Sequence, residues 1–171
     1  VPSELPHPLG GVPELGLAIL DRVLSERGDR VLRLMIRARE FDDRLAELLT
    51  ADVVGVGVYV HNRAEVARLV RRLRAAGFAG LIVLGGPECR SIEAILRDFD
   101  GFDAVIRGEA EDVLPAVLET LDLIRRGELT EAARRALALR GVVLRVADEL
   151  WLCDTAHRSR AAVVRAPRPL L

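Results

Sequence analysis

The sequence contains no lysine, two cysteines and 4% aromatic residues, and it has no long uninterrupted apolar segment. A membrane-spanning helix needs roughly 20 apolar residues in succession, so none is predicted. Two lone cysteines argue against a disulfide framework and favour a reduced, cytoplasmic setting. The N-terminal residues show no basic stretch followed by an apolar one, so no secretory signal is expected.

The charges exclude further classes of function. All 25 basic residues are arginine, and 26 acidic residues balance them to a formal net charge of -1. Arginine and acidic residues alternate along the helical segments, a pattern typical of solvated helix faces. No nucleic-acid partner is therefore indicated. The length of 171 residues corresponds to about one domain, large enough to bury a core.

Apolar periodicity predicts alternating strands and helices. A helix from Glu14 ends at Gly28, and further elements follow as strands over 31–36, 53–60, 81–84 and 104–106 and helices over 41–49, 64–76, 91–98 and 111–126. A cap near Asp42 or Asp43 is expected for the second helix. Strand–helix alternation at this spacing predicts an α/β fold with a doubly wound parallel sheet.

The pattern changes at each end of the chain. A helix over 129–139, a hairpin over 141–153 and an extended tail over 161–171 predict an appendage, which divides the chain into 1–126 and 127–171. At the other end a Pro/Gly-rich loop follows Val1–Leu5, and Pro2 disfavours a central strand there. The first central strand is therefore missing, or its place in the sheet is filled in another way.

Three loops follow the apolar strands, at the edge where parallel sheets bind ligands. The first brings an aromatic ring, an imidazole and an amide, which can stack on and hydrogen-bond a large ring. The second and third loops bring glycines and carboxylates. The glycines let a ligand approach the backbone. The candidate binding residues are Tyr59, Val60, His61, Asn62, Gly85, Gly86, Pro87, Glu88, Gly108 and Glu109.

Each loop also has a purely structural interpretation. The Gly85–Glu88 segment suits a tight turn between strand and helix, and Asn62 suits the cap of the helix that begins at Arg63. Glu111 is best interpreted as an acidic residue at a helix N-terminus. No nucleophile elbow and no Cys–His pair is present, so the chain shows no complete active site of its own.

Taken together, the segments 9–20, 53–62, 82–88 and 103–111 resemble the cobalamin-binding domain that precedes the radical-SAM domain in cobalamin-dependent radical-SAM enzymes. That family commonly has Gly-Glu-Gly-Glu where this chain has Gly108-Glu-Ala110-Glu111. The resemblance implies a flavodoxin-like or Rossmann-like fold. It makes residues 127–171 a connector towards a radical-SAM barrel.

The resemblance also implies how the cofactor binds. The chain lacks the Asp-x-His-x-x-Gly motif that supplies histidine to cobalt, so base-off cobalamin is implied, with its nucleotide tail near Gly85, Gly86 and Gly108. Tyr59 and His61 would lie with Asn62 near the lower corrin face. His61 is a disfavoured cobalt ligand, because a metal-bound imidazole needs a second hydrogen-bond partner that the sequence does not identify.

The chain also lacks the Cys-x-x-x-Cys-x-x-Cys motif that holds a radical-SAM iron–sulfur cluster. The cluster and S-adenosylmethionine would therefore belong to a partner subunit or another domain. The leading hypothesis is a cobalamin-binding module that supplies methylcobalamin to a radical-SAM methyltransferase. The alternatives are a non-catalytic α/β interaction module without a cofactor and a flavin- or nucleotide-binding flavodoxin-like domain.

Overall fold

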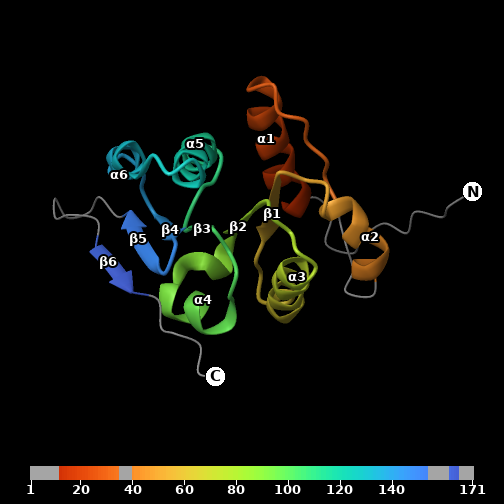
Figure 1. The fold of residues 1–171 in the computed structure, drawn as a ribbon. Helices are drawn as coiled ribbons and strands as arrows, with labels where there is room; N and C mark the ends of the chain where they lie inside the picture. Colours follow the sequence, from red (N-terminus) through yellow and green to blue (C-terminus); the bar gives the residue numbers. More distant parts are fainter. Residues whose placement is uncertain (1–11, 35–39, 154–161, 166–171) are drawn as a thin grey trace, which may run out of the picture. The chain divides into compact units, whose positions relative to one another are not determined.

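The computed structural model describes residues 12–34, 40–153 and 162–165 (Figure 1). The chain divides into two compact units, Val1–Met35 and Ile36–Leu171. The first unit contains the helix α1 (Val12–Glu26), whose C-terminus is closed by Gly28 at a φ of 90°. A glycine in this left-handed conformation ends a helix without steric cost.

The strand predicted over 31–36 is not formed in the described part of that range. Residues 31–34 have no regular secondary structure, and residues 35 and 36 lie outside the described residues. Leu32 is 62% exposed, and Arg33 pairs with Asp21 of α1 at 3.1 Å. Alternating apolar residues form a strand only where a neighbour supplies backbone partners and a surface to pack on, and no such neighbour pairs with residues 31–34 here.

The second unit is built on one six-stranded sheet in the order β1-β2-β3-β4-β5-β6. β1, β2 and β3 are parallel, whereas the remaining strands pair antiparallel. The strands are Val53–Gly57, Leu81–Gly85, Ala104–Ile106, Val142–Val146, Glu149–Cys153 and Ala162–Arg165. The α/β prediction is thus confirmed, and the predicted hairpin turns at Ala147 and Asp148 as expected.

Helices cover both faces of this sheet (Figure 1). α3 and α4 lie on one face, and α5 and α6 lie on the other. Their bounds are Arg63–Ala75, Ile92–Asp98, Leu114–Arg125 and Leu129–Ala136. The shorter helix α2 (Phe41–Leu48) lies against α3, to which an Asp42–Arg72 ion pair joins it. Right-handed crossovers place helices in this way between neighbouring parallel strands.

The core consists of the side chains between these layers. Ile82 and Leu84 of β2, Phe102, and Leu144 of β4 are completely buried, and Val105 is 1% exposed. Apolar side chains that lose all contact with water contribute about 1.5–3 kcal/mol each to folding. Near the other end of the sheet, Trp151 of β5 is half-buried and stands opposite Leu144 in the β4–β5 register.

Several predicted boundaries need correction. α2 begins at Phe41 and has no side-chain cap, so Asp42 and Asp43 lie in its first turn rather than at its cap. The expected extended tail contains the strand β6, because Ala162–Arg165 pairs with β5. The rest of the predicted tail, 166–171, lies outside the described residues. The division of the chain at 126/127 stays a prediction.

Candidate functional site

The three predicted loops lie at one edge of the sheet, where β1, β2 and β3 end. β1 and β2 are in register, so Gly57 stands beside Gly85 at this edge. β4 begins at the same edge, since Val142 pairs with Ile106 and the Arg107 amide donates to the Gly141 carbonyl at 2.7 Å. The carboxyl ends of parallel strands therefore meet here, as the sequence predicted.

The loop after β1 is closed by the side chain of Asn62. β1 ends at Gly57, three residues before the predicted end. The backbone amide of Tyr59 donates to the side-chain oxygen of Asn62 at 2.8 Å. The side-chain Nδ2 of Asn62 donates to the Gly57 carbonyl at 2.9 Å. Asn62 stands at the N-cap position of α3 but makes no capping bond with its side chain. The expected cap is wrong because Asn can also hydrogen-bond nearby backbone, which favours turns.

Two rings of this loop stack on each other. The Tyr59 and His61 rings lie 5.6 Å apart between centroids, with 19° between their planes. The Tyr59 ring also lies over Gly57, because a Cβ at Gly57 would come within 3.0 Å of its Cε2. Val60, between the two rings in sequence, is 80% exposed. The loop thus presents an aromatic pair and an exposed apolar side chain at the edge of the sheet.

The loop after β2 packs directly on the loop after β1. The Val58 amide donates to the Gly85 carbonyl at 2.7 Å, and the Glu88 amide donates to the Val58 carbonyl at 3.3 Å. Gly86 has a φ of 102°, and a Cβ there would lie 2.8 Å from the Val58 oxygen. Gly86 is therefore required by chain packing. Pro87–Arg90 continues as the 3-10 turn η2, which the sequence did not predict.

This turn contains a buried thiol. Cys89 is completely buried, and burial raises its pKa to about 12. The nearby Arg63 guanidinium opposes that shift, but with a smaller effect. A thiol that stays protonated at neutral pH is neither a nucleophile nor a metal ligand.

The loop after β3 is the most open of the three. Gly108 and Glu109 are both exposed, and α5 begins only at Leu114, three residues later than predicted. Glu111 therefore precedes the helix, and its interpretation as a capping residue at the helix N-terminus is wrong, because Val113 occupies the N-cap position. The physical reason is Pro115, because proline is favoured in the first turn of a helix, where its missing amide needs no partner.

Two glycines near the ends of β2 and β3 have no close neighbours on their side-chain side. A Cβ built at Gly85 or at Gly108 would meet no atom within 4 Å, in contrast to one at Gly86. Gly85 and Gly108 thus leave open space above the ends of β2 and β3. At Gly57 the nearest atoms to such a Cβ belong to the Tyr59 ring.

The site offers no cluster of metal ligands. Within residues 12–34, 40–153 and 162–165 no three His, Cys, Asp or Glu side chains are grouped in a way that could hold a metal ion. His61 is exposed, and its described ring contact is to Tyr59.

Residues 7–118 match the model of the B12 binding domain. The chain belongs to the B12-binding domain family. The matched range includes all three loops, so the edge described above lies within the B12-binding domain. Cobalamin is therefore the cofactor that the family supports. Among the described residues, no helix is both long and apolar enough to cross a membrane.

Two further similarities were found. The chain is 35% identical over 135 residues to a 1-deoxy-D-xylulose 5-phosphate reductoisomerase from Methylococcus capsulatus, over 78% of this chain and 32% of that protein. It thus spans about a third of the length of this curated relative. It also resembles the N-terminal domain of the hypothetical protein TM0182 from Thermotoga maritima, with 24% identity and a TM-score of 0.44, over 60% of this chain and 81% of that one.

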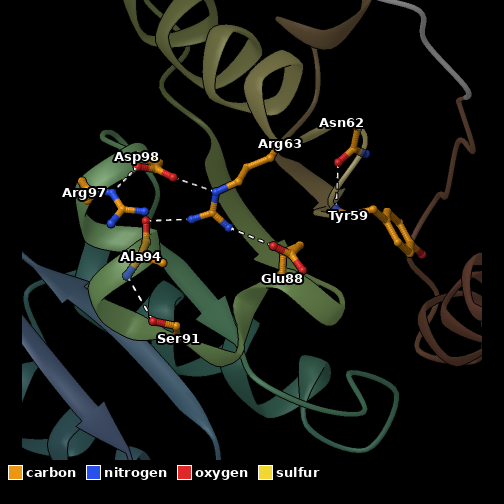
Figure 2. A network of polar contacts seen from close by, with 8 residues as sticks. All are labelled: Tyr59, Asn62, Arg63, Glu88, Ser91, Ala94, Arg97 and Asp98. Atoms are coloured by element: carbon orange, nitrogen blue, oxygen red, sulfur yellow. Dashed lines mark hydrogen bonds and ion pairs between the residues drawn. The ribbon is translucent and has the colours of Figure 1, made fainter.

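Within the B12-binding domain, the three loops contain the open backbone at Gly85 and Gly108 and the stacked Tyr59 and His61 rings. The ten predicted binding residues lie in these three loops, although Gly86 and Asn62 also hold the loops in shape. One residue that the sequence interpretation did not select, Arg63, connects two of the loops (Figure 2).

Proposed function

We propose that this chain binds base-off cobalamin at the loops after β1, β2 and β3 and presents it to a radical-SAM domain or subunit. The observation that carries the proposal is the open backbone surface at Gly85 and Gly108, within the range that matches the B12 binding domain. Bound methylcobalamin would supply a methyl group for transfer. The residues of this chain bind the cofactor, orient it and keep water from one of its faces.

The base-off state is supported by the donors that the loops contain. The sequence has no Asp-x-His-x-x-Gly motif. His61 is exposed, and its described ring contact is to Tyr59 rather than to a carboxylate that would support metal binding. In this proposal the nucleotide tail extends over Gly85 and Gly108, where the glycines leave room for it.

Retention of a corrin tests the proposal. The purified chain is incubated with hydroxocobalamin, desalted and examined by visible absorbance. We expect retained corrin with a base-off spectrum. A chain that unfolds cooperatively but releases all corrin on desalting would refute the proposal and favour an interaction module. Retained flavin or nucleotide, tested in parallel, would favour a flavodoxin-like binder.

A matched pair of variants locates the site. Gly85→Leu fills the open space above β2, whereas Ala133→Leu adds the same bulk to an exposed position of α6. Gly85→Leu should lower affinity for hydroxocobalamin at least about tenfold, because the ligand would lose a planar contact surface. Ala133→Leu should bind as the unaltered chain does. Equal affinity of the two variants would move the site away from Gly85.

The radical-SAM partner is tested separately. The proposal expects a Cys-x-x-x-Cys-x-x-Cys protein or domain encoded in frame with this chain or beside it, and reading the flanking coding region checks this. Its absence would leave cobalamin binding in place and remove the radical-SAM assignment.

A further inference from the structure

Arg63 has an unusual position at the start of α3. It is the first residue of that helix, where the positive end of the helix dipole disfavours a cation. Its side chain is nevertheless drawn inwards and only 19% exposed. An arginine so placed must be stabilised by contacts outside its own helix.

Those contacts reach two other elements (Figure 2). On α4 the guanidinium donates to the Asp98 carboxylate at 2.7 Å and to the Ala94 carbonyl at 2.8 Å. It also lies 5.4 Å from the centroid of the Phe99 ring. The third nitrogen of the Arg63 guanidinium lies 3.5 Å from the carboxylate of Glu88 in η2. Arg63 therefore joins the start of α3 both to α4 and to the turn after β2.

The α4 side of this network is the firmer one. Arg97 and Arg63 both donate to Asp98, and these hydrogen bonds lower the pKa of its carboxyl group, that of Arg97 most. The fixed planar fork of arginine suits several simultaneous acceptors, which lysine cannot match. The guanidinium is thus anchored at α4, and its contact with Glu88 extends that anchor to η2.

The Glu88 contact matters because of where Glu88 lies. It follows Gly85 and Gly86 by three and two residues in the loop after β2. Its own amide reaches the Val58 carbonyl at 3.3 Å, a weak backbone bond. Across the described ranges, Arg63 is the ion-pair partner of the Glu88 side chain. That ion pair restrains the turn after the open surface, together with the buried Cys89 side chain.

We propose that Arg63 is a positioning residue for the cobalamin surface: through Glu88 it sets the place of the Pro87–Arg90 turn and hence of Gly85. The inference rests on the proposed function, since the surface it positions is the one assigned to cobalamin. Arg63 would thereby connect the start of α3, after the β1 loop, with the turn after β2, and α4 would anchor its guanidinium. Arg63 itself needs no contact with the ligand.

Five variants test this role, the fifth being Arg63→Lys, which keeps the charge without the guanidinium fork. Arg63→Met removes the guanidinium but keeps a long side chain, and Glu88→Gln removes the charge that faces it. The double variant combines both changes. Arg68→Met changes an exposed arginine on the same helix, whose partner is Glu65 at 3.2 Å, and serves as the matched control. Affinity for hydroxocobalamin is measured by titration, and amide hydrogen exchange over residues 85–90 is measured without ligand.

Coupled residues give non-additive effects, which the double variant detects. We expect affinity to fall about fivefold in Arg63→Met and about threefold in Glu88→Gln, and the double variant to bind no more weakly than Arg63→Met. Exchange over residues 85–90 should be faster in all three, and Arg63→Lys should lie between Arg63→Met and the unaltered chain. Arg68→Met should change neither affinity nor exchange.

The outcomes separate the two proposals. If the unaltered chain binds hydroxocobalamin and Arg63→Met binds equally well, or if the effects of the two single changes simply add, the positioning role is overturned alone. If the unaltered chain retains no hydroxocobalamin, the proposed function is overturned and the role of Arg63 with it. Should Arg63→Met fail to fold, Glu88→Gln keeps the α4 contacts and decides the question by the same two measurements.

Discussion

Two adjacent glycines in the loop after β2 have opposite roles. A side chain at Gly86 would collide with the Val58 backbone, 2.8 Å from its oxygen, and the φ of 102° disfavours any other residue. A side chain at Gly85 would meet no atom within 4 Å. Gly86 is needed to hold two loops together, and Gly85 leaves room for a ligand. Sequence alone cannot distinguish them, because both roles call for the same residue.

This difference predicts opposite outcomes for the same substitution. Gly86→Ala should lower the free energy of unfolding by about 1–3 kcal/mol, because the new Cβ is forced against backbone in a strained conformation. Gly85→Ala should stay within about 0.5 kcal/mol of the unaltered chain, because it meets open space. Urea denaturation of both variants measures the difference. Equal destabilisation would show that Gly85 also has a structural role.

At the scale of elements, Arg74 joins the end of α3 to the start of two strands. Its guanidinium donates to the carbonyls of Gly101, Phe78 and Gly80, and it pairs with Asp103. Asp103 in turn accepts the Ile82 amide at 2.6 Å. The amino ends of β2 and β3 are thus tied to one side chain, at the edge of the sheet opposite to the candidate site.

Arg74→Met should therefore be among the costlier single changes in this chain. It would remove the arginine partner of Asp103 and a donor from three carbonyls, and we expect a loss of about 2–4 kcal/mol in the free energy of unfolding. Arg71→Met, one turn earlier on the exposed face of α3, should cost less than about 0.5 kcal/mol. Thermal unfolding of both variants makes the comparison. A similar midpoint for the two would contradict the importance of these contacts.

Elements were predictable where the apolar pattern and the residues that favour turns or helix ends agree, as in β2, α3 and the β4–β5 hairpin. They were not predictable where structure depends on a distant neighbour. The segment 31–36 has a strand-like pattern, yet its described residues, 31–34, form no strand. Pro115 carried a usable signal for the start of α5, which the acidic Glu111 obscured. The side chain of Asn62 turns backwards instead of capping, and no local pattern distinguishes those two choices.

The candidate site also has a part that the sequence could predict and a part that it could not. The three loops could be placed at one edge from strand order alone, because parallel strands end together. Arg63 could not be selected, since its importance comes from Asp98, Ala94 and Glu88, which lie 25 to 35 residues away. The sequence does show a cation at the first position of a helix, which is unfavourable. That observation identifies Arg63 as important only when its partners are known.

At the scale of the whole molecule, the absence of lysine simplifies the response to alkaline pH. Burial raises the pKa of Cys89 from 9.0 to about 12 and that of Cys153 from 9.0 to about 11. The folded chain therefore keeps two thiol protons that the unfolded chain releases above about pH 9. Stability contributed by these thiols is complete below pH 9 and is lost as the pH rises towards the folded pKa values.

The free energy of unfolding should thus begin to fall near pH 9, with a slope that approaches about 1.4 kcal/mol per pH unit for each thiol. Cys89→Val should remove the contribution of one thiol to the slope of unfolding free energy against pH, because valine fills the buried site without a titrating group. Denaturation between pH 7 and 10.5 measures both curves. Parallel curves for the variant and the unaltered chain would show that Cys89 does not contribute to the pH dependence.

The half-buried Trp151 gives the molecule a built-in optical reporter. It is the single tryptophan of the chain, and β5 holds it in the antiparallel part of the sheet, outside the three loops. A bound corrin absorbs light at the wavelengths that tryptophan emits, so energy transfer will dim the fluorescence without any change of fold. Binding, release and the effect of each variant can therefore be followed in real time on the unlabelled chain.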